Sequence, residues 1–336
     1  MVFKILHDIF TSEKKLLNSG KIEEAINLLT NKKLIYQGVL NIPKGGGLVI
    51  KNNWTSRSQI LFKSKLFGDD EDRPLTKSDG TWTYFASDIA YHLNKYKRGF
   101  DIIINIWGSD HGGYIKRLKS AVHAVIKKDF PFKIHLCSMV RFIENENVLK
   151  MSKRKGNFIT IKNVVDKVGS DVLRFIMMTR KSDAPLDFNL DQIIKNSQNS
   201  PVFYIQYAYA RSCSIQKQIY NKFPNLELNI KSLLLSNFSY LKKEYFPLVK
   251  LLTNWPKNIY IATKLQEPHR IAFYLNAIAT NFHSLWSKGK KDCSLRFISS
   301  KNPELTKSRF VLIKAVKIVI ESGLSIFNIK PKDKMF

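Results

Sequence analysis

The sequence predicts an α/β domain built on a parallel sheet, followed by a domain made entirely of helices. Over residues 80–180, apolar runs typical of buried strands alternate with stretches of helical periodicity. This alternation is typical of a parallel sheet covered by helices. From Asp191 onward the periodicity is helical throughout. Because 336 residues exceed what a single core usually holds, we expect two domains, at residues 1–190 and 191–336.

Residues 1–67 are expected to supply helix and then a hairpin. Ser12 can cap a helical turn within residues 1–35. The apolar face at helical spacing consists of Ile22, Ala25, Ile26, Leu28 and Leu29. Residues 34–40 and 58–67 have the composition of strands, and the glycines at 45–47 predict the turn of a hairpin. These glycines do not form a phosphate-binding loop, because no Gly-Lys-Ser/Thr follows them.

Two sets of residues have side chains that can bind metal ions. The acidic run at 68–72 could bind a metal, but a solvated turn is the commoner role for such a run. The cysteines at positions 137, 213 and 293 are far apart and match neither a zinc spacing nor a disulfide framework. We therefore expect reduced cysteines and no bound metal.

Residues 82–97 have helical periodicity and follow a strong turn signal at 78–80. Tyr84 and Asp88 stand four residues apart, which places a phenol and a carboxylate on one face of this helix. Such a pair could hold a cationic ligand, the carboxylate pairing with the charge and the phenol forming a wall. An ordinary surface pair is the alternative, and the spacing alone favours it.

Residues 101–107 read as a buried strand that ends in Gly-Ser-Asp-His-Gly-Gly. Polar residues and glycines at the carboxyl end of a strand, followed by a helix at 114–127, are typical of ligand sites in open α/β sheets. A ligand-facing role is therefore favoured for His111, with a structural histidine as the alternative. The next strands are expected at 134–140 and within 142–149.

The stretch Lys-Met-Ser-Lys-Arg-Lys-Gly-Asn at 150–157 lies between a strand and a helix. Its lysines, with a hydroxyl residue between them, can bracket a triphosphate, and the glycine gives the backbone freedom to close over it. A solvated basic turn is the alternative. A helix broken at Gly169 is expected over residues 164–180.

The helical part begins with an aromatic and basic face on its first long helix. This face consists of Tyr204, Tyr207, Ala208 and Arg211. Aromatic rings beside an arginine can stack and pair with RNA bases, although tyrosines packed against neighbouring helices would give the same spacing. Further helices around 233–252, 270–286 and 307–323 have the lengths expected of a bundle.

The formal net charge of +28 is extreme and favours a polyanionic partner. Residues 201–336 hold 22 Lys and Arg against 7 Asp and Glu, a net charge of +15. Nucleic acid is favoured over membrane because the sequence has no basic amphipathic anchor or lipidation signal. A genome rich in lysine codons is an alternative source of part of this excess. No apolar run reaches the length of a membrane span and no signal peptide is evident, so we expect a cytosolic protein.

Several motifs follow one another along the chain: SDGTWTYFASDIAYH (78–92), WGSDHGGY (107–114), KMSKRKGNF (150–158), DVLRF (171–175), PVFYIQYAYAR (201–211) and EPHRIAFYL (267–275). Together they resemble the bacterial arginyl-tRNA synthetases, and the resemblance runs from about residue 8 to the end. It implies the second part of a class I nucleotide-binding (Rossmann-like) catalytic domain, followed by a helical anticodon-binding domain of the DALR type. It also implies that ATP with Mg²⁺ and L-arginine are substrates, that no prosthetic group is bound, and that tRNA(Arg) is the partner.

The resemblance assigns roles to single residues. It makes 150–154 the KMSKS loop, with Lys150, Ser152 and Lys153 catalytic and Lys153 stabilising the ATP phosphates as pyrophosphate departs. The residues implied to contact ATP are Met139, Val140, Lys150, Met151, Ser152 and Lys153. The residues implied to bind arginine are Tyr84, Asp88 and His111, and those implied to bind tRNA are Tyr204, Tyr207, Ala208 and Arg211.

The chain also departs from the family pattern. Class I synthetases carry a His-x-Gly-His signature that holds ATP, and none of the seven histidines here belongs to such a pattern. The amino-terminal domain of the bacterial members is also expected to be missing. Three readings therefore stay open. They are an enzyme with little activity as a lone polypeptide, one half of a split synthetase, and a non-catalytic tRNA-binding fragment or the remnant of a broken synthetase gene.

Overall fold

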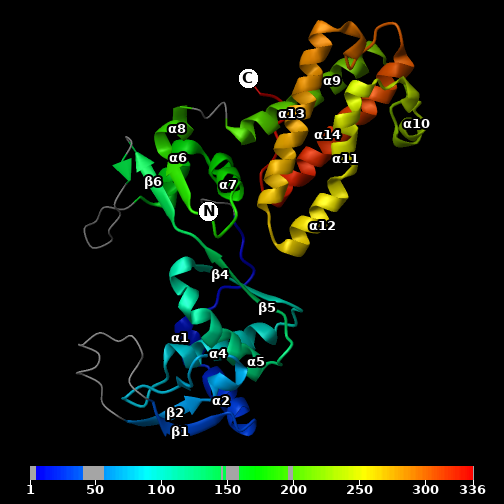
Figure 1. Cartoon of the computed structure of the whole chain (residues 1–336). Coiled ribbons are helices and arrows are strands. Elements are labelled where there is room, and N and C mark those ends of the chain that lie inside the picture. The colour runs from blue at the N-terminus through cyan, green and yellow to red at the C-terminus, as the bar shows by residue number, and fades with distance from the viewer. Residues whose placement is uncertain (1–4, 41–56, 145–146, 149–158, 196–199, 336) are drawn as a thin grey trace. The chain divides into compact units, whose positions relative to one another are not determined.

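The computed structural model describes residues 5–40, 57–144, 147–148, 159–195 and 200–335 (Figure 1). By packing, the chain divides into a first unit of residues 6–139 and a second unit of residues 140–336 together with 1–5. This division lies at residues 139/140, whereas the sequence predicted a domain boundary at residues 190/191. The predicted boundary concerns domains of the family and stays a prediction.

The first unit begins with two short helices, α1 (Glu13–Leu17) and α2 (Lys21–Asn31). Ser12 caps α1, its hydroxyl accepting from the Lys15 amide at 3.4 Å. Gly20 separates the helices with a φ of 70°, a left-handed conformation that glycine adopts without steric cost. The helix expected over 1–35 is therefore shorter and interrupted, although most of its predicted apolar face is buried.

An antiparallel sheet of β1 (Ile35–Val39), β2 (Ser58–Phe62) and β3 (Arg73–Pro74) follows. The predicted pairing of the first two strands is confirmed, with Ile35 opposite Phe62 and Val39 opposite Ser58. The glycine turn at 45–47 lies outside the described residues. The second strand ends earlier than expected, because residues 64–67 form the 3-10 turn η1.

A strand–helix–strand segment completes the first unit. It contains α4 (Tyr84–Tyr96), β4 (Ile103–Gly108), the 3-10 segment η2 (Ser109–Tyr114), α5 (Ile115–Val125) and β5 (Phe132–Cys137). β4 and β5 are parallel, which confirms the predicted alternation. The buried strand expected at 101–107 is present but buried on one face only, since Ile103 and Asn105 are buried whereas Ile104 and Ile106 are exposed.

The second unit opens with a small mixed sheet. β6 (Val140–Glu144) pairs in antiparallel with β7 (Asn147–Val148) and in parallel with β8 (Leu186–Asn189), a strand that the sequence did not predict. α6 (Ile161–Val168) and α7 (Ser170–Met178) meet at Gly169, as predicted.

Helices make up the rest of the second unit (Figure 1). They are α8 (Leu190–Lys195), α9 (Pro201–Lys222), α10 (Ile230–Leu234), α11 (Phe246–Thr253), α12 (Trp255–Leu265), α13 (His269–Lys291) and α14 (Pro303–Ile326). The prediction of a single helix around 233–252 is wrong, because 3-10 turns at 238–240 and 243–245 interrupt it. A separate helix, α11, then begins at Phe246 with Pro247 in its first turn, a position that proline favours. One continuous core extends from Val164 to Ile329. No helix among the described residues is long and apolar enough to cross a membrane.

Candidate functional site

The amino-terminal turns of α4 carry the predicted pair of phenol and carboxylate. Thr83 caps the helix, its hydroxyl accepting from the Ala86 amide at 3.3 Å. Tyr84 is largely exposed, with 76% of its surface accessible, and the Lys77 ammonium lies 5.6 Å from its ring centroid. Asp88, one turn later, is half-buried. The two side chains thus lie one turn apart at the start of one helix, and their predicted role as a pair that holds a cationic ligand stays a prediction.

Tyr114 contacts Asp88 and was missed by reasoning from sequence. Its hydroxyl donates to Oδ2 of Asp88 at 2.7 Å. Burial raises the pKa of the Asp88 carboxyl, and the Tyr114 hydroxyl opposes that rise. Burial also raises the pKa of Tyr114, and the nearby Asp88 carboxylate raises it further. A half-buried carboxylate with one oxygen already bonded can offer its other oxygen to a cationic ligand, whose charge would favour the ionised form.

His111 lies at the predicted strand end, and its side chain lies near Asp110 and Trp107. It follows β4 in η2, is exposed, and places its Nε2 atom 3.5 Å from Asp110 Oδ2. Its ring lies 6.2 Å from the ring of Trp107, centroid to centroid. Its predicted contribution to an arginine site stays a prediction.

A buried polar network ties the helix of Asp88 to β4. The Asp88 carbonyl can only accept, so the His92 Nδ1–H must donate to it, at 2.7 Å. The Nε2 atom of His92 then accepts from Nδ2 of Asn105 at 2.8 Å. Lys95 donates to Oδ1 of Asn105 at 3.0 Å. Burial lowers the pKa of His92 to about 4 and that of Lys95 to about 8. A neutral imidazole therefore links the helix turn of Asp88 to Asn105 of β4 and fixes its position.

Replacing His92 by glutamine should remove a loss of stability on acidification. The imidazole pKa is 6.5 as the reference value and about 4 when folded, so the unfolded chain binds the extra proton between these values. Stability from this group is complete above about pH 6.5 and falls towards pH 4, by about 3 kcal/mol in total. Urea unfolding at pH 7 and pH 5 measures the part of this loss that falls between those values, about 2 kcal/mol.

His269→Gln is the matched control, since His269 lies in the other unit. It should keep the pH dependence of the unmodified chain. The raised pKa of Asp88 acts in the opposite direction but is present in every variant, so it cancels in the comparison. An equal loss on acidification with and without His92 would contradict the assignment of a buried neutral imidazole.

The predicted ATP residues are only partly within the described structure. Lys150, Met151, Ser152 and Lys153 lie outside it. Met139 is exposed at the end of the first unit. Val140 begins β6 in the second unit and pairs with Leu186.

The predicted aromatic and basic face of α9 is assembled around His283 of α13. His283 Nε2–H donates to the Tyr204 carbonyl at 3.1 Å, so its Nδ1 accepts from Arg211 at 2.9 Å. Arg211 also donates to the Tyr207 hydroxyl at 2.6 Å. The guanidinium lies 4.2 Å from the Tyr207 ring centroid and 4.8 Å from that of Trp286. These contacts hold a cation among aromatic rings at the surface.

Ala208 differs from its neighbours on this helix. Its side chain is fully buried in the core, whereas Tyr204 and Tyr207 are exposed over 37% and 45% of their surfaces. The helical face predicted from the spacing thus turns Ala208 inward. His283, which is buried, and Trp286, which is half-buried, were missed by sequence reasoning and lie beneath the exposed tyrosines. Burial lowers the pKa of His283, and the positive charge of Arg211 lowers it further, so the ring is kept neutral.

A cavity of about 770 Å³ adjoins this cluster. Among its lining residues are Tyr207, Arg211 and Trp286, together with the cations Lys217, Lys317 and Lys334. Asp333 is the one acidic residue among the described residues that line it. A hollow with aromatic rings, whose charged side chains are mostly basic, suits a nucleic-acid strand.

The acidic run at 68–72 is not a wholly solvated turn. Asp69 is buried and accepts two hydrogen bonds from Arg73, at 2.7 and 2.8 Å, and one from Ser64 at 2.8 Å. Burial alone would raise the pKa of Asp69, but the bonds from Arg73 hold it below its ordinary value. Within the described parts of both units, no three His, Cys, Asp or Glu side chains could hold a metal ion.

Two family models match the sequence. The model of class I tRNA synthetases (I, L, M and V) matches residues 78–191, and that of the DALR anticodon binding domain matches residues 205–335. The first range contains the Asp88 site, and the second contains the Arg211 cluster except Tyr204.

Curated relatives match nearly the whole chain. It is 48% identical over 331 residues to the arginine–tRNA ligase of Wolbachia from Brugia malayi, and 50% identical over 332 residues to that of Ehrlichia ruminantium. Each match covers 98% of this chain and 56% of the relative. The chain therefore spans about half the length of the curated relatives it matches.

Solved structures show the same fold. An arginyl-tRNA synthetase structure from Campylobacter jejuni, described as putative, matches with a TM-score of 0.77 at 29% identity, covering 99% of this chain and 65% of the other. The Thermus thermophilus arginyl-tRNA synthetase matches with a TM-score of 0.75 at 16% identity, covering 99% and 61%. At that lower identity the likeness concerns the fold alone.

Proposed function

Because this chain belongs to the arginyl-tRNA synthetase family, we propose that it contributes the arginine-binding and tRNA-binding parts of an arginine–tRNA ligase. That enzyme would convert ATP, L-arginine and tRNA(Arg) into arginyl-tRNA, AMP and diphosphate, in the cytosol. The observation that carries the proposal is the match to arginine–tRNA ligases over 98% of the chain, which includes both clusters described above.

Asp88 is the proposed partner of the arginine guanidinium. Its Oδ2 is fixed by Tyr114, and a carboxylate matches the charge and planar geometry of a guanidinium. Tyr84, exposed one turn earlier, would form a wall of the pocket, and His111 would supply a further polar contact. Met139, Val140 and the loop residues Lys150, Met151, Ser152 and Lys153 are proposed to bind ATP, with Mg²⁺.

The tRNA contact is proposed for Tyr204, Tyr207 and Arg211. Their exposed rings and held guanidinium can stack on unpaired bases and pair with phosphates. The buried side chain of Ala208 does not reach the surface in this arrangement, so the proposal rests on the other three residues.

The direct test is arginine-dependent exchange of pyrophosphate into ATP, in the presence of tRNA(Arg). These 336 residues contain no His-x-Gly-His, so we expect little exchange by the chain alone and strong exchange when it is combined with the remaining part of a family enzyme. Absence of exchange in the combined enzyme would refute the proposal, and strong exchange by the chain alone would refute the need for a complement.

The second candidate is a subunit of a split synthetase, for which β4 provides a specific observation. In the part of the first unit that the structure describes, β4 pairs with β5 only. Ile104 and Ile106 on β4 are exposed over 44% and 72% of their surfaces. An open strand edge beside exposed isoleucines favours association with further polypeptide. Co-purification of a second polypeptide from the source cell would support this reading, and recovery of the chain alone would contradict it.

Replacing Asp88 by asparagine should raise the KM for arginine about 10- to 100-fold in the combined enzyme, with kcat little changed. The substitution keeps the shape but removes the charge, and hydrogen bonds to charged groups contribute about 1.5–3 kcal/mol. A contact made equally in the ground and transition states alters KM rather than kcat. Steady-state kinetics with varied arginine checks this. Asp129→Asn, at an exposed position of the same unit, is the control, and an unchanged KM in Asp88→Asn would remove Asp88 from the pocket.

Replacing Arg211 by glutamine should weaken binding of tRNA(Arg) about 3- to 10-fold at low salt. The salt dependence should also become shallower by about one unit of slope, since one phosphate-pairing cation is lost. Filter binding over a series of salt concentrations measures both. Lys250→Gln on α11 removes the same charge at an exposed position elsewhere in the unit. Equal effects of the two substitutions would show that only net charge matters.

A further inference from the structure

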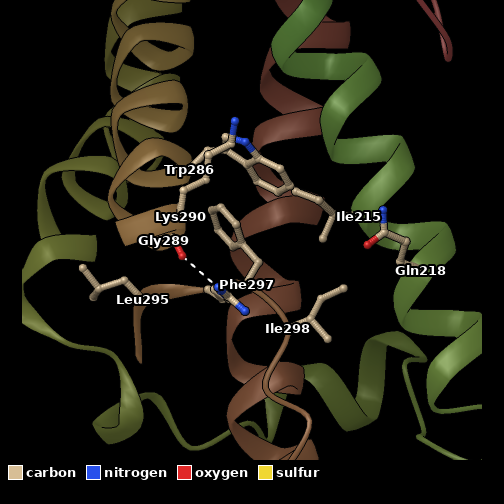
Figure 2. Close-up of a pocket in the computed structure, with 9 residues that line it drawn as sticks. Ile215, Gln218, Trp286, Gly289, Lys290, Leu295, Phe297 and Ile298 are labelled. Carbon is tan, nitrogen blue, oxygen red and sulfur yellow. Dashed lines mark hydrogen bonds between the residues drawn. The ribbon is translucent and has the colours of Figure 1, made fainter. Parts of the chain in front are cut away.

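A second cavity in the second unit shares Gln218 and Trp286 with the larger cavity, but the function proposed above gives it no role. It measures about 280 Å³ and lies where α9, the last turns of α13 and the segment 295–298 meet (Figure 2). The residues that line it are Ile215, Gln218, Trp286, Gly289, Lys290, Leu295, Arg296, Phe297 and Ile298. Its volume is just below the usual range of about 300–1,000 Å³ for small-ligand pockets, which suits a single ring system.

The walls of this cavity are aromatic and firmly held. Figure 2 shows the rings of Trp286 and Phe297 next to each other, with Ile215 and Ile298 to one side of them. The Phe297 ring is almost fully buried and stacks on Phe282, with 5.4 Å between the centroids. A wall fixed in this way can receive a flat ring without rearranging its own side chains.

Gly289 brings the end of α13 close to the segment that forms the opposite wall. A Cβ atom at this position would lie only 3.0 Å from the Leu295 carbonyl oxygen. Arg296 donates from Nε to the Gly289 carbonyl at 3.2 Å, a bond drawn in Figure 2. This hydrogen bond joins the two closely approaching segments and so fixes the width of the cavity.

The rim of the cavity is positively charged. Lys290 and Arg296 are exposed there, and none of the nine described lining residues is acidic. Asp292 is near in sequence, but its carboxylate accepts from the Ser294 hydroxyl at 2.6 Å. Apolar aromatic walls under a cationic rim match a ligand that is flat and apolar at one end and anionic at the other.

We propose that this cavity binds a nucleobase that carries a phosphate. The base would lie against Trp286 and Phe297, an arrangement in which base–aromatic stacking contributes about 1–3 kcal/mol per base. The phosphate would pair with Lys290 and Arg296, and the Gln218 amide can donate to and accept from the edge of the base. A free mononucleotide and a nucleotide within an RNA strand share this chemistry. The proposal does not depend on arginine–tRNA ligase activity.

Isothermal titration of the full chain with UMP and CMP tests the proposal at low salt. Pyrimidine nucleotides are used so that binding to the proposed ATP site, which takes an adenine nucleotide, does not contribute to the signal. We expect both to bind at least tenfold more tightly than ribose 5-phosphate, which has the phosphate without the base. Equal binding of ribose 5-phosphate would show general attraction to positive charge and would overturn the proposal, as would no binding of either nucleotide.

Two variants connect that binding to this cavity. Ile298→Trp fills the space at a half-buried position and should weaken UMP binding at least tenfold, with folding checked by thermal unfolding. Lys290→Gln should weaken it about fivefold, whereas Lys288→Gln removes the same charge from the same helix outside the lining and should change it less than twofold. Unchanged binding in a folded Ile298→Trp, or equal effects of the two lysines, would overturn the proposal.

An RNA strand containing 4-thiouridine distinguishes the two sources of the ligand. Crosslinking to the peptide 286–298 that excess UMP suppresses would identify a base within RNA as a ligand. UMP binding without that crosslink would identify the free nucleotide. Loss of tRNA affinity in Arg211→Gln is a separate result, so failure at this cavity leaves the proposed tRNA contact standing.

Discussion

Replacing Lys153 by alanine is expected to slow arginine activation in the combined enzyme by roughly 100- to 1000-fold. The resemblance of 150–154 to the KMSKS loop gives Lys153 the role of stabilising charge on the ATP phosphates as pyrophosphate departs. Removing one group that stabilises charge in a transition state typically slows the chemical step by this amount. Single-turnover formation of arginyl-adenylate measures the effect directly, because product release does not enter it.

Lys155→Ala is the control for Lys153, because it removes the same charge from the same loop. We expect less than a tenfold effect from it, and tRNA affinity should be unchanged by either substitution. Equal slowing by both variants would mean that the loop acts through its total charge rather than through Lys153. A rate within threefold of the unmodified enzyme in Lys153→Ala would remove this residue from the transition state.

The local signals in the sequence predicted α4 and the break at Gly169 because each depends on neighbouring residues. Thr83 caps α4 through the Ala86 amide three residues on, and Gly169 has a φ of 84°, which favours glycine. Such features are complete within one turn of the chain and need no tertiary partner. They are therefore readable from the sequence.

Features set by distant partners were not predictable in this way. β8 is only four residues long and exists through pairing with β6, 46 residues earlier in the chain. The bond from Tyr114 to Asp88 spans 26 residues. Helical spacing put Tyr204 and Ala208 on one face, but packing against neighbouring helices decided that Ala208 is buried while Tyr204 stays partly exposed. In each case the deciding contact comes from another element.

The contact of Arg309 with the wall of the smaller cavity also depends on residues from another element. Arg309 of α14 is 1% exposed, and its guanidinium donates to the carbonyls of Ser294, at 2.6 Å, and Arg296. It lies 5.1 Å from the ring centroid of Tyr245, whose hydroxyl donates to the Leu295 carbonyl at 2.8 Å. Burial lowers the pKa of Arg309, and the nearby Tyr245 and Asp292 act in the opposite direction.

Replacing Arg309 by alanine should destabilise the second unit by about 3–5 kcal/mol. The substitution leaves a cavity in the core, and it removes charged hydrogen bonds from two carbonyls of the segment 292–298. Arg309→Met should lose less, about 1–3 kcal/mol, because it fills most of the space and removes a buried charge that is costly to desolvate. Urea unfolding followed by tryptophan fluorescence measures both variants.

Lys307→Ala, on the same helix and only half-buried, should stay within about 0.5 kcal/mol of the unmodified chain. The order of the three variants is informative, because each mechanism predicts a different one. If filling the core were all that mattered, Arg309→Met would be nearly as stable as the unmodified chain. If the guanidinium's bonds to Ser294 and Arg296 were all that mattered, methionine and alanine would be equally destabilising. We expect the stability of Arg309→Met to lie between that of the unmodified chain and that of Arg309→Ala. The reason is that Arg309 both fills the core and anchors the segment that forms the cavity wall.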